Sequence, residues 1–365
     1  MTDSQRRSTI RAAVAIAVAA VSVVVAAVVV VSMQDDPVEQ PSGIQAMTPT
    51  YSEETTDTQA PTGPILDPTW RIDAETVYGR EFAAFRSPAA DLQYDSSVTG
   101  VIDAGDVLVT AVGLPNPRSY SVDAIEFVAI DSDDGGVRWK KSPGSVDECA
   151  SVPVGDDIVC LDSYSDVASI VRIGVDDGEV LRTPIPEDWF PYAIESDGAS
   201  VYLLEGNPED SESVLHGGSP DALDRMWSRP ITSFAGWDGV DGTLIHVADE
   251  RGLVTLGGES TFFDPRTGQP LDGLELTSDG VVVDNNGTQL WQLRDTYASD
   301  ATIGDTVYSI DGEAVVATTA GDIRWRWPLA DGARGFTEWG SIVQTRSGVY
   351  FLGNDSMVRL ESVPT

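Results

Sequence analysis

The segment FVAIDSDDGGVRW, residues 127–139, decides the fold of this chain. Its first half alternates, so that Phe127 and Ala129 fall on one face of a strand. Val128 and Ile130 fall on the other face. An aspartate then starts a turn, and a glycine supplies the positive φ that closes a short hairpin. The returning strand ends in a tryptophan, whose large ring can pack against a neighbouring sheet. The segment therefore predicts a β-hairpin within a larger assembly of sheets.

The turn and tryptophan positions of this hairpin recur along most of the remaining chain. In the first copy they are Asp131, Gly135 and Trp139. The later copies keep some of these positions, namely Gly178, Trp227, Asp264, Gly268, Gly287, Trp291, Gly321 and Trp325. In two copies Arg182 and Asp272 occupy the tryptophan position instead. We expect the repeated residues to be structural rather than catalytic.

Repetition of short strands and Gly/Asp turns predicts an all-β fold, a β-propeller with a period of roughly 40 residues. A four-stranded blade buries too little surface alone, so neighbouring blades must stack against one another. Residues 68–365 accommodate about seven four-stranded blades of that length. The spacing between copies is uneven, so six or eight blades remain open.

The segment DPTWRID, residues 67–73, looks like the last strand of a blade without a hairpin before it. We expect Trp70 and its neighbours to pair with the C-terminal segment FLGNDSMVRL, residues 351–360. Such closure removes two sheet edges that would otherwise favour aggregation.

The repeat pattern A-x-D-x-x-T-G-x-x-x-W resembles that of the pyrroloquinoline-quinone-like β-propellers, a quinoprotein-like family with a BamB-like branch. The positions that carry the resemblance are Ala129, Asp131, Gly135 and Trp139, then Asp264, Thr267 and Gly268, and finally Gly321 and Trp325. The resemblance spans residues 68–365 and implies the propeller fold. Because such a superfamily holds both enzymes and scaffolds, it does not define a function.

The N-terminal residues have the pattern of a membrane anchor. Residues 1–11 include Arg6, Arg7 and Arg11, and residues 12–33 form an uncharged run of about 22 residues, enough to cross a hydrocarbon core of roughly 30 Å. Basic residues before the run and acidic residues after it predict a cytoplasmic tail, a single-pass signal-anchor helix and an extracytoplasmic remainder. A cleaved signal peptide is the alternative. No cysteine follows the run to carry the lipid of a BamB-like lipoprotein.

Residues 34–67 are rich in Pro, Thr, Ser and acidic side chains and contain no Lys or Arg. This composition predicts a disordered acidic linker. The whole chain has 59 acidic and 22 basic residues, a formal net charge of −37. A surface so negative repels phosphate backbones, which excludes a nucleic-acid partner.

The two cysteines, Cys149 and Cys160, are separated by a strand-turn-strand pattern. Outside the cell an even number of cysteines favours a disulfide. Two buried thiols are the alternative.

The sequence does not indicate a metal or cofactor site. Its two histidines, His216 and His246, are interpreted as a loop residue and a core or channel-lining residue. The acidic turns that include Asp131, Asp176 and Glu179 lack the bidentate glutamate of a calcium loop, and we interpret them as solvated turns. The vicinal cysteine pair that the family resemblance implies for quinone enzymes is missing.

We therefore expect a non-enzymatic binding or scaffold protein of the bacterial cell envelope with a protein partner. The expected recognition surface consists of the longer insertions at 114–123, 205–221 and 294–300, because binding function concentrates on propeller loops. The alternative is a quinone- or ion-dependent enzyme with its site in the propeller channel.

Overall fold

The computed structural model describes residues 63–92, 98–116, 122–185, 190–207, 212–232, 243–248, 250–293, 300–310, 314–329 and 340–362. These stretches all belong to the second of two units, Gln59–Thr365. The predicted cytoplasmic tail 1–11, the predicted transmembrane segment 12–33 and residues 34–62 of the predicted linker lie outside them. Within the described part of the chain, no helix is both long and apolar enough to span a membrane.

The described strands form seven antiparallel sheets, which we call blades I to VII in chain order. Blade I contains β2 (Ala84–Arg86), β3 (Ile102–Asp103), β4 (Val107–Pro115), β5 (Val122–Asp131) and β6 (Val137–Lys141). Blade II contains β7 (Glu148–Cys149), β8 (Asp157–Asp162), β9 (Ser169–Gly174) and β10 (Val180–Pro184). Blade III contains β11 (Phe190–Ser196), β12 (Val201–Asn207), β13 (Glu212–Gly218) and β14 (Trp227–Thr232).

The remaining blades are shorter in places. Blade IV contains β15 (Leu244–Ala248), β16 (Arg251–Leu256) and β17 (Glu259–Phe263), and blade V contains β18 (Leu274–Leu276), β19 (Val281–Asp284) and β20 (Gln289–Gln292). Blade VI contains β21 (Asp300–Ile303), β22 (Thr306–Ile310), β23 (Ala314–Thr319) and β24 (Asp322–Pro328). Blade VII contains β25 (Ser341–Gln344), β26 (Gly348–Leu352), β27 (Ser356–Ser362) and the N-terminal β1 (Trp70–Asp73). A five-residue helix, α2 (Ala74–Tyr78), and a 3-10 turn, η1 (Leu223–Arg225), lie outside the sheets.

Alternation along each strand decides which neighbour a blade packs against. On β5, Phe127 and Ala129 pack with residues of blade II, whereas Val128 and Ile130 pack with residues of blade VII. A central strand is thus buried on both faces and reads as a continuous apolar run. The alternation expected from residues 127–139 is confirmed.

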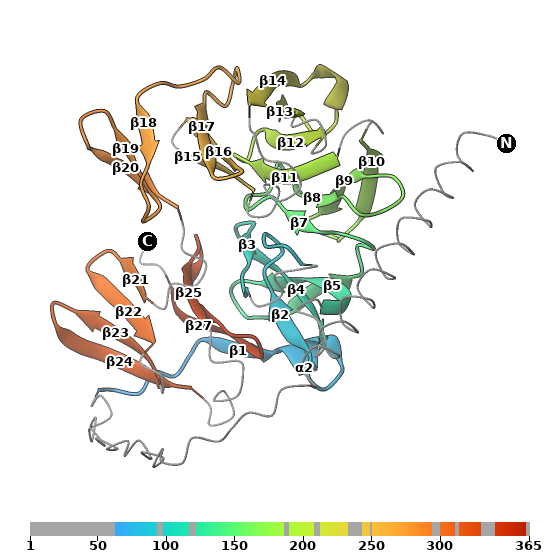
Figure 1. Cartoon of the computed structure of the whole chain (residues 1–365). Helices are drawn as coiled ribbons and strands as arrows, with labels where there is room; N and C mark the ends of the chain where they lie inside the picture. Colours follow the sequence, from blue (N-terminus) through green and yellow to red (C-terminus); the bar gives the residue numbers. More distant parts are fainter. Residues whose placement is uncertain are drawn as a thin grey trace, which may run out of the picture. The chain divides into compact units, whose positions relative to one another are not determined.

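Six apolar clusters join the blades in the order VI, VII, I, II, III, IV and V. Figure 1 shows the sheets following one another around a common centre in this order. Among the described residues, none of these clusters joins blade V to blade VI. The seven sheets, four of them four-stranded, are consistent with a β-propeller of about seven blades.

Blade VII is completed by the N-terminal strand, as expected. β1 pairs antiparallel with β27, and Trp70 lies opposite Arg359. The sheet therefore combines residues from both ends of the propeller, which protects the outer edge of β27.

The linker prediction is wrong at its last residues. The predicted disordered segment extends to residue 67, but Ile65 forms a parallel bridge with Arg326 of β24. The amide of Leu66 donates to the carbonyl of Arg326 over 2.7 Å, and Leu66 packs with the core between blades VI and VII. Arg326 donates its amide in return to the carbonyl of Pro64 over 2.8 Å, so backbone pairing and the packing of Leu66 hold this segment on the edge of blade VI, while Ile65 stays 68% exposed.

The predicted disulfide is present. Cys149 on β7 and Cys160 on β8 are directly opposed in the ladder and covalently joined. Both are buried in the core between blades I and II.

Candidate functional site

Three of the repeated tryptophans lie over the glycine turn of the next blade. The indole N–H of Trp139 donates to the carbonyl of Val175 over 2.7 Å, and a Cβ at Gly178 would lie 2.8 Å from the ring. Trp70 has the same relation to the turn of Gly135, where its N–H donates to the carbonyl of Ser132. The ring thus needs a glycine beneath it because any side chain would clash.

The third such pair is Trp227 over Gly268, with the indole N–H donating to the carbonyl of Pro265 over 3.1 Å. In each of the three turns the accepting carbonyl belongs to the residue three positions before the glycine. Each glycine also has a positive φ, between 66° and 75°. The sequence placed Trp139 and Gly135 in one hairpin, but the tryptophan contacts the glycine of the following blade.

These turns share one hydrogen-bond pattern. The amide of Gly135 donates to the carbonyl of Asp131 over 2.9 Å, and the amide of Gly268 donates to the carbonyl of Asp264 over 2.7 Å. Each aspartate side chain accepts the amide of the residue two positions on. Arg138 also binds the Asp131 carboxylate, and this hydrogen bond holds the pKa of that carboxyl below its usual range.

The other repeat positions do not form this contact. Gly287 and Gly321 have φ values of 75° and 88°, but a Cβ at either would meet no atom within 4 Å. Trp291 packs on Phe262 of the preceding blade, and its buried indole nitrogen has no hydrogen-bond partner among the described residues. Trp325 donates to the carboxylate of Glu361 on β27 instead of a turn carbonyl.

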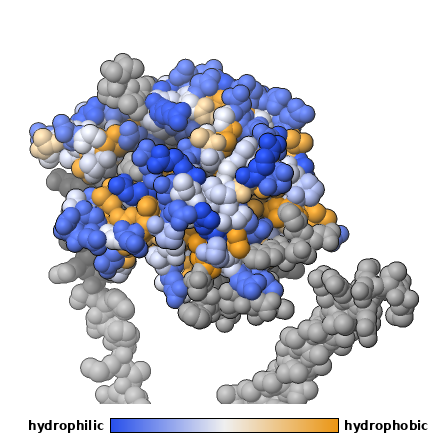
Figure 2. Space-filling model, turned by 90° about the horizontal axis from the view of Figure 1, so that it is seen from above, coloured by the Kyte–Doolittle hydropathy of each residue, from blue (hydrophilic) through white to orange (hydrophobic). Residues whose placement is uncertain are grey.

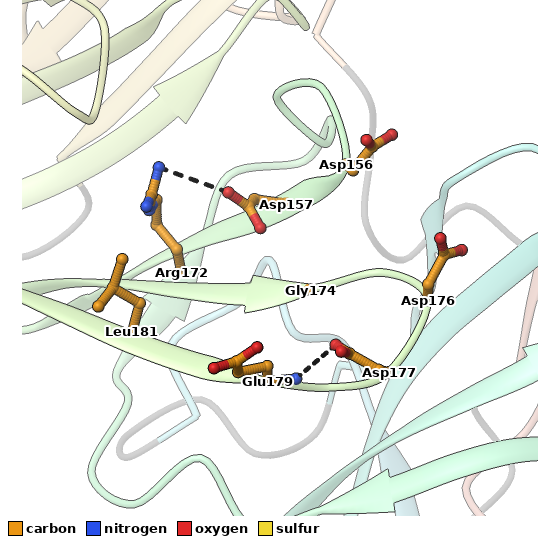
Figure 3. A pocket seen from close by; sticks show the side chains of 8 residues that line it. All are labelled: Asp156, Asp157, Arg172, Gly174, Asp176, Asp177, Glu179 and Leu181. Carbon is orange, nitrogen blue, oxygen red and sulfur yellow. Dashed lines mark hydrogen bonds and ion pairs between the residues drawn. The ribbon is translucent and has the colours of Figure 1, made fainter.

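A pocket of about 380 Å³ lies on blade II, beside its Asp/Gly turn. It is lined by Asp156, Asp157, Arg172, Gly174, Asp176, Asp177, Glu179 and Leu181. Figure 3 shows the acidic side chains gathered near the turn ends of β8, β9 and β10, with Arg172 and Leu181 further along the strands. We call this set the acidic pocket.

The charge of the acidic pocket is not balanced from within. Its one cation, Arg172, lies 3.5 Å from Asp157 and also pairs with Asp221 beyond the pocket. No ion pair within the described stretches involves Asp156, Asp176 or Asp177, and the same is true of Glu179. The Asp177 carboxylate only accepts the amide of Glu179 over 2.8 Å. The pocket therefore presents a concentrated negative field to solvent, which favours a basic ligand group.

Two glutamates join the first strands of blades II and III. Glu148 on β7 accepts the amide of Ile194 on β11 over 3.0 Å. Glu195 on β11 accepts the amide of Ser151 over 2.8 Å and the amide of Ser196 over 2.7 Å. Burial raises the pKa of Glu148 to about 8 and that of Glu195 to about 7. Both carboxyls thus hold protons near neutral pH more readily than ordinary glutamates.

Blade III carries a Ser–His–Glu row that the sequence did not reveal. His216 lies on β13, not in a loop as we expected, and its Nδ1 is 2.8 Å from the hydroxyl of Ser228 on β14. Its Nε2 is 3.0 Å from the Glu205 carboxylate on β12, without the alignment of a hydrogen bond. Cross-strand register alone brings these distant positions together, so the only available signal was the strand pattern around them.

His246, the second histidine, lies on β15 of blade IV. His246 stacks on Trp291 with 6.4 Å between ring centroids, and burial lowers its pKa. In the stretches that the structure describes, no group of three or more His, Cys, Asp or Glu side chains is placed to hold a metal ion.

The expected recognition insertions are described only in part. Residues 117–121, 208–211 and 294–299 fall outside the described residues. Much of the 205–221 insertion belongs to strands β12 and β13, so it is a hairpin within blade III, not a free loop.

One exposed aromatic side chain stands near the helix between β1 and β2. Phe82 is 80% exposed and has a φ of 65°, which is unfavourable for a bulky residue. Its amide donates to the carboxylate of Glu75 over 2.8 Å, which holds this conformation. Figure 2 shows that apolar residues otherwise form separate patches on a mainly hydrophilic face. An exposed aromatic held in an unfavourable conformation suits contact with a partner.

No family model matches this chain, and no curated protein matches it. Among solved structures it is similar to BamB from Moraxella catarrhalis, with 16% identity, a TM-score of 0.37 and coverage of 82% of this chain and 99% of that chain. It is also similar to a gluconolactonase from Xanthomonas campestris, with 14% identity, a TM-score of 0.36 and coverage of 82% and 97%. The β-propeller domain of the Trilobed protease from Pyrococcus furiosus has 8% identity, a TM-score of 0.33 and coverage of 72% and 78%. Likenesses of this size carry no argument about function, and the fold rests on the strand pairing described above.

Proposed function

We propose that this protein is a non-enzymatic binding scaffold of the bacterial cell envelope. The observation that carries the proposal is the acidic pocket, where four of five carboxylates have no ion-pair partner among the described residues. Such a site attracts lysine or arginine side chains of a protein partner and accelerates their association. The acidic pocket therefore replaces the longer insertions as the proposed recognition site.

The location outside the cytoplasm belongs to the same proposal. The uncharged run at 12–33, with arginines before it and aspartates after it, supports a single-pass anchor with the propeller outside. The disulfide Cys149–Cys160 supports an oxidising compartment. An alkaline phosphatase fusion at the C-terminus should be active if the propeller is exported, and an inactive, stably produced fusion would contradict this placement.

Binding can be measured with the peptide Gly-Lys-Gly-Lys-Gly-Lys by fluorescence anisotropy on the full-length protein. We expect the double variant Asp156→Asn/Asp176→Asn to weaken binding about five- to tenfold, since exposed charge pairs contribute about 0.2–1 kcal/mol each. The matched control Asp279→Asn/Asp305→Asn removes the same charge from exposed turns of blades V and VI. Equal losses in both variants would show a general charge effect and would sink the proposed site.

A second candidate is hydrolytic activity at the Ser228–His216–Glu205 row, because its nucleophile and base lie within 2.8 Å. Ser228 Oγ would attack an ester carbonyl while His216 Nδ1 accepts its proton, and His216 would return that proton to the alcohol that leaves. Water would then hydrolyse the acyl ester on Ser228, which releases the carboxylic acid and restores the hydroxyl. We expect Ser228→Ala to abolish any hydrolysis of p-nitrophenyl acetate. A rate unchanged in that variant would remove this candidate, which is distinct from the quinone- or ion-dependent activity considered above.

A further inference from the structure

Two arginines are more than nine-tenths buried in the described residues, Arg86 at 5% and Arg359 at 6% exposure. Arg86 is on β2 of blade I, and Arg359 is on β27 of blade VII. Burying a guanidinium costs free energy unless an anion and hydrogen bonds compensate it. The two side chains differ in whether a carboxylate takes part and in whether Nη2 has an acceptor.

Arg359 has acceptors for both of its Nη nitrogens, one of them a carboxylate, although its buried Nε, like that of Arg86, has no hydrogen-bond partner among the described residues. Its Nη1 lies 3.3 Å from the Asp133 carboxylate and donates to the carbonyl of Ser132 over 2.8 Å. Its Nη2 donates to the carbonyl of Ser347 over 2.7 Å. A carboxylate and carbonyls from neighbouring turns thus surround the charge.

Arg86 has no carboxylate partner among the residues that the structure describes. Within these residues its Nη1 alone is occupied, donating to the carbonyl of Phe85 over 2.6 Å and to the Asn354 side-chain oxygen over 2.8 Å. Among the described residues nothing accepts from Nε or Nη2, and Nε is buried. These two nitrogens form the side of the guanidinium that matches the two oxygens of a carboxylate.

The missing partner is not explained by scarcity of acids, since the chain has 59 of them against 22 basic residues. Burial alone lowers the pKa of Arg86 to about 10, so the side chain is still charged at neutral pH. An unpartnered buried polar group in a low-dielectric interior costs free energy, and a ligand that accepts from it would remove that cost.

We propose that Arg86 binds the carboxylate group of a ligand through Nε and Nη2, at the boundary between blades I and VII. Its 5% exposure admits only a small group, so the ligand is a small carboxylic acid or the terminal carboxylate of an extended chain. This site goes beyond the proposed scaffold function, because it selects an anion while the acidic pocket selects a cation.

The test uses the full-length protein in detergent, with thermal unfolding measured at constant ionic strength in sodium acetate, sodium phosphate or sodium chloride. A ligand that binds only the folded state raises the melting temperature. We expect acetate to raise it by a few degrees over chloride, and phosphate to have a smaller effect. The tripeptide Gly-Gly-Gly and its C-terminal amide separate the two carboxylate sources, since only the free acid should act if an extended chain fits.

Two variants connect the effect to Arg86. R86K keeps the positive charge but removes the two guanidinium N–H groups that would bind a carboxylate together. We expect R86K to lose the rise in melting temperature that acetate causes, whereas R359K should keep it. If R86K fails to fold, Asn354→Asp gives Arg86 an internal carboxylate, and we expect a higher melting temperature without acetate and a reduced response to it. Equal effects of acetate and chloride, a stronger effect of phosphate, or an acetate response that R86K or Asn354→Asp leaves intact would each overturn the proposal.

Discussion

The repeated tryptophans make different contacts in two regions of the propeller. Trp70, Trp139 and Trp227 are in blades VII, I and III, and Trp291 and Trp325 are in blades V and VI. At the first three positions an indole lies on a glycine turn and donates to its backbone. At Trp291 the ring packs on the preceding blade, and no residue in the described part of the chain accepts from the indole nitrogen. Yet the tryptophan follows the turn glycine by four residues in both hairpins, from Gly135 to Trp139 and from Gly287 to Trp291.

The length of the next turn explains the difference. In each accepting turn the glycine amide donates to the carbonyl of the residue four positions before it, as Gly135 does to Asp131. The turn at Gly287 of blade V is one residue shorter, because the amide of Gly287 donates to the carbonyl of Asp284, and the blade before it has Asp272 at the tryptophan position. For Trp291 the next turn is the one at Gly321 in blade VI. The turn at Gly321 contains only Ala320 and Gly321, both with positive φ. A short turn presents no carbonyl for an indole to reach, so the same tryptophan position serves different contacts.

The largest expected effect comes from filling the space beneath a tryptophan. Gly178→Ala adds a Cβ 2.8 Å from Trp139 and places alanine at a φ of 67°. We expect a loss of about 3 kcal/mol in the free energy of unfolding, measured by urea denaturation, from overpacking and backbone strain together.

Gly287→Ala is the matched control, since φ is 75° and the space is open. Only the backbone strain remains there, so we expect a loss of about 1 kcal/mol. Similar losses at both glycines would mean that the ring contact does not matter.

The second effect concerns the covalent link in blade II. The double variant Cys149→Ala/Cys160→Ala opens a loop of 11 residues, and we expect it to lose about 2–3 kcal/mol. Dithiothreitol should destabilise the wild type by the same amount and leave the double variant unchanged. A reductant effect that persists in the variant would contradict this assignment.

A smaller difference should appear between Trp139→Phe and Trp291→Phe, which change side chains of similar burial, 7% and 9% exposed. The first variant leaves the Val175 carbonyl without its donor, so we expect it to lose about 1–2 kcal/mol more than the second. Urea midpoints measured side by side test this, and a larger loss at Trp291 would reverse the comparison.

The smallest expected effect is a pH dependence of the free energy of unfolding, which arises from Glu148 where blades II and III meet. The raised pKa of Glu148, about 8, means that the folded protein holds a proton that the unfolded chain releases near pH 4.3. Stability from this group is therefore fully present below that value and falls as pH rises toward 8. Thermal unfolding between pH 5 and 9 measures the slope.

Glu148→Gln removes this titration while keeping a hydrogen-bonding side chain of similar size. We expect a shallower decline of melting temperature with pH in the variant, although general charge repulsion remains. An identical slope in both proteins would rule out Glu148 as a source of the dependence.

Much of the fold was predictable from local residues. The alternation in FVAIDSDDGGVRW predicts a strand with two packed faces, and Trp70 predicts the closing strand, because both depend on period and position. The disulfide followed from compartment and spacing. The contacts of Arg86 and of the Ser228–His216–Glu205 row could not be predicted, because they depend on which strands become neighbours.

By itself the sequence determined a repeating all-β chain, the disulfide and a strongly acidic surface, because each depends on residue type and short spacing. Only the tertiary structure decided which tryptophan meets which glycine and, among the described residues, which carboxylates have no ion-pair partner and which buried arginine has no anion beside it. These features join residues from different blades, and their free energy depends on distances that short-range sequence patterns do not specify.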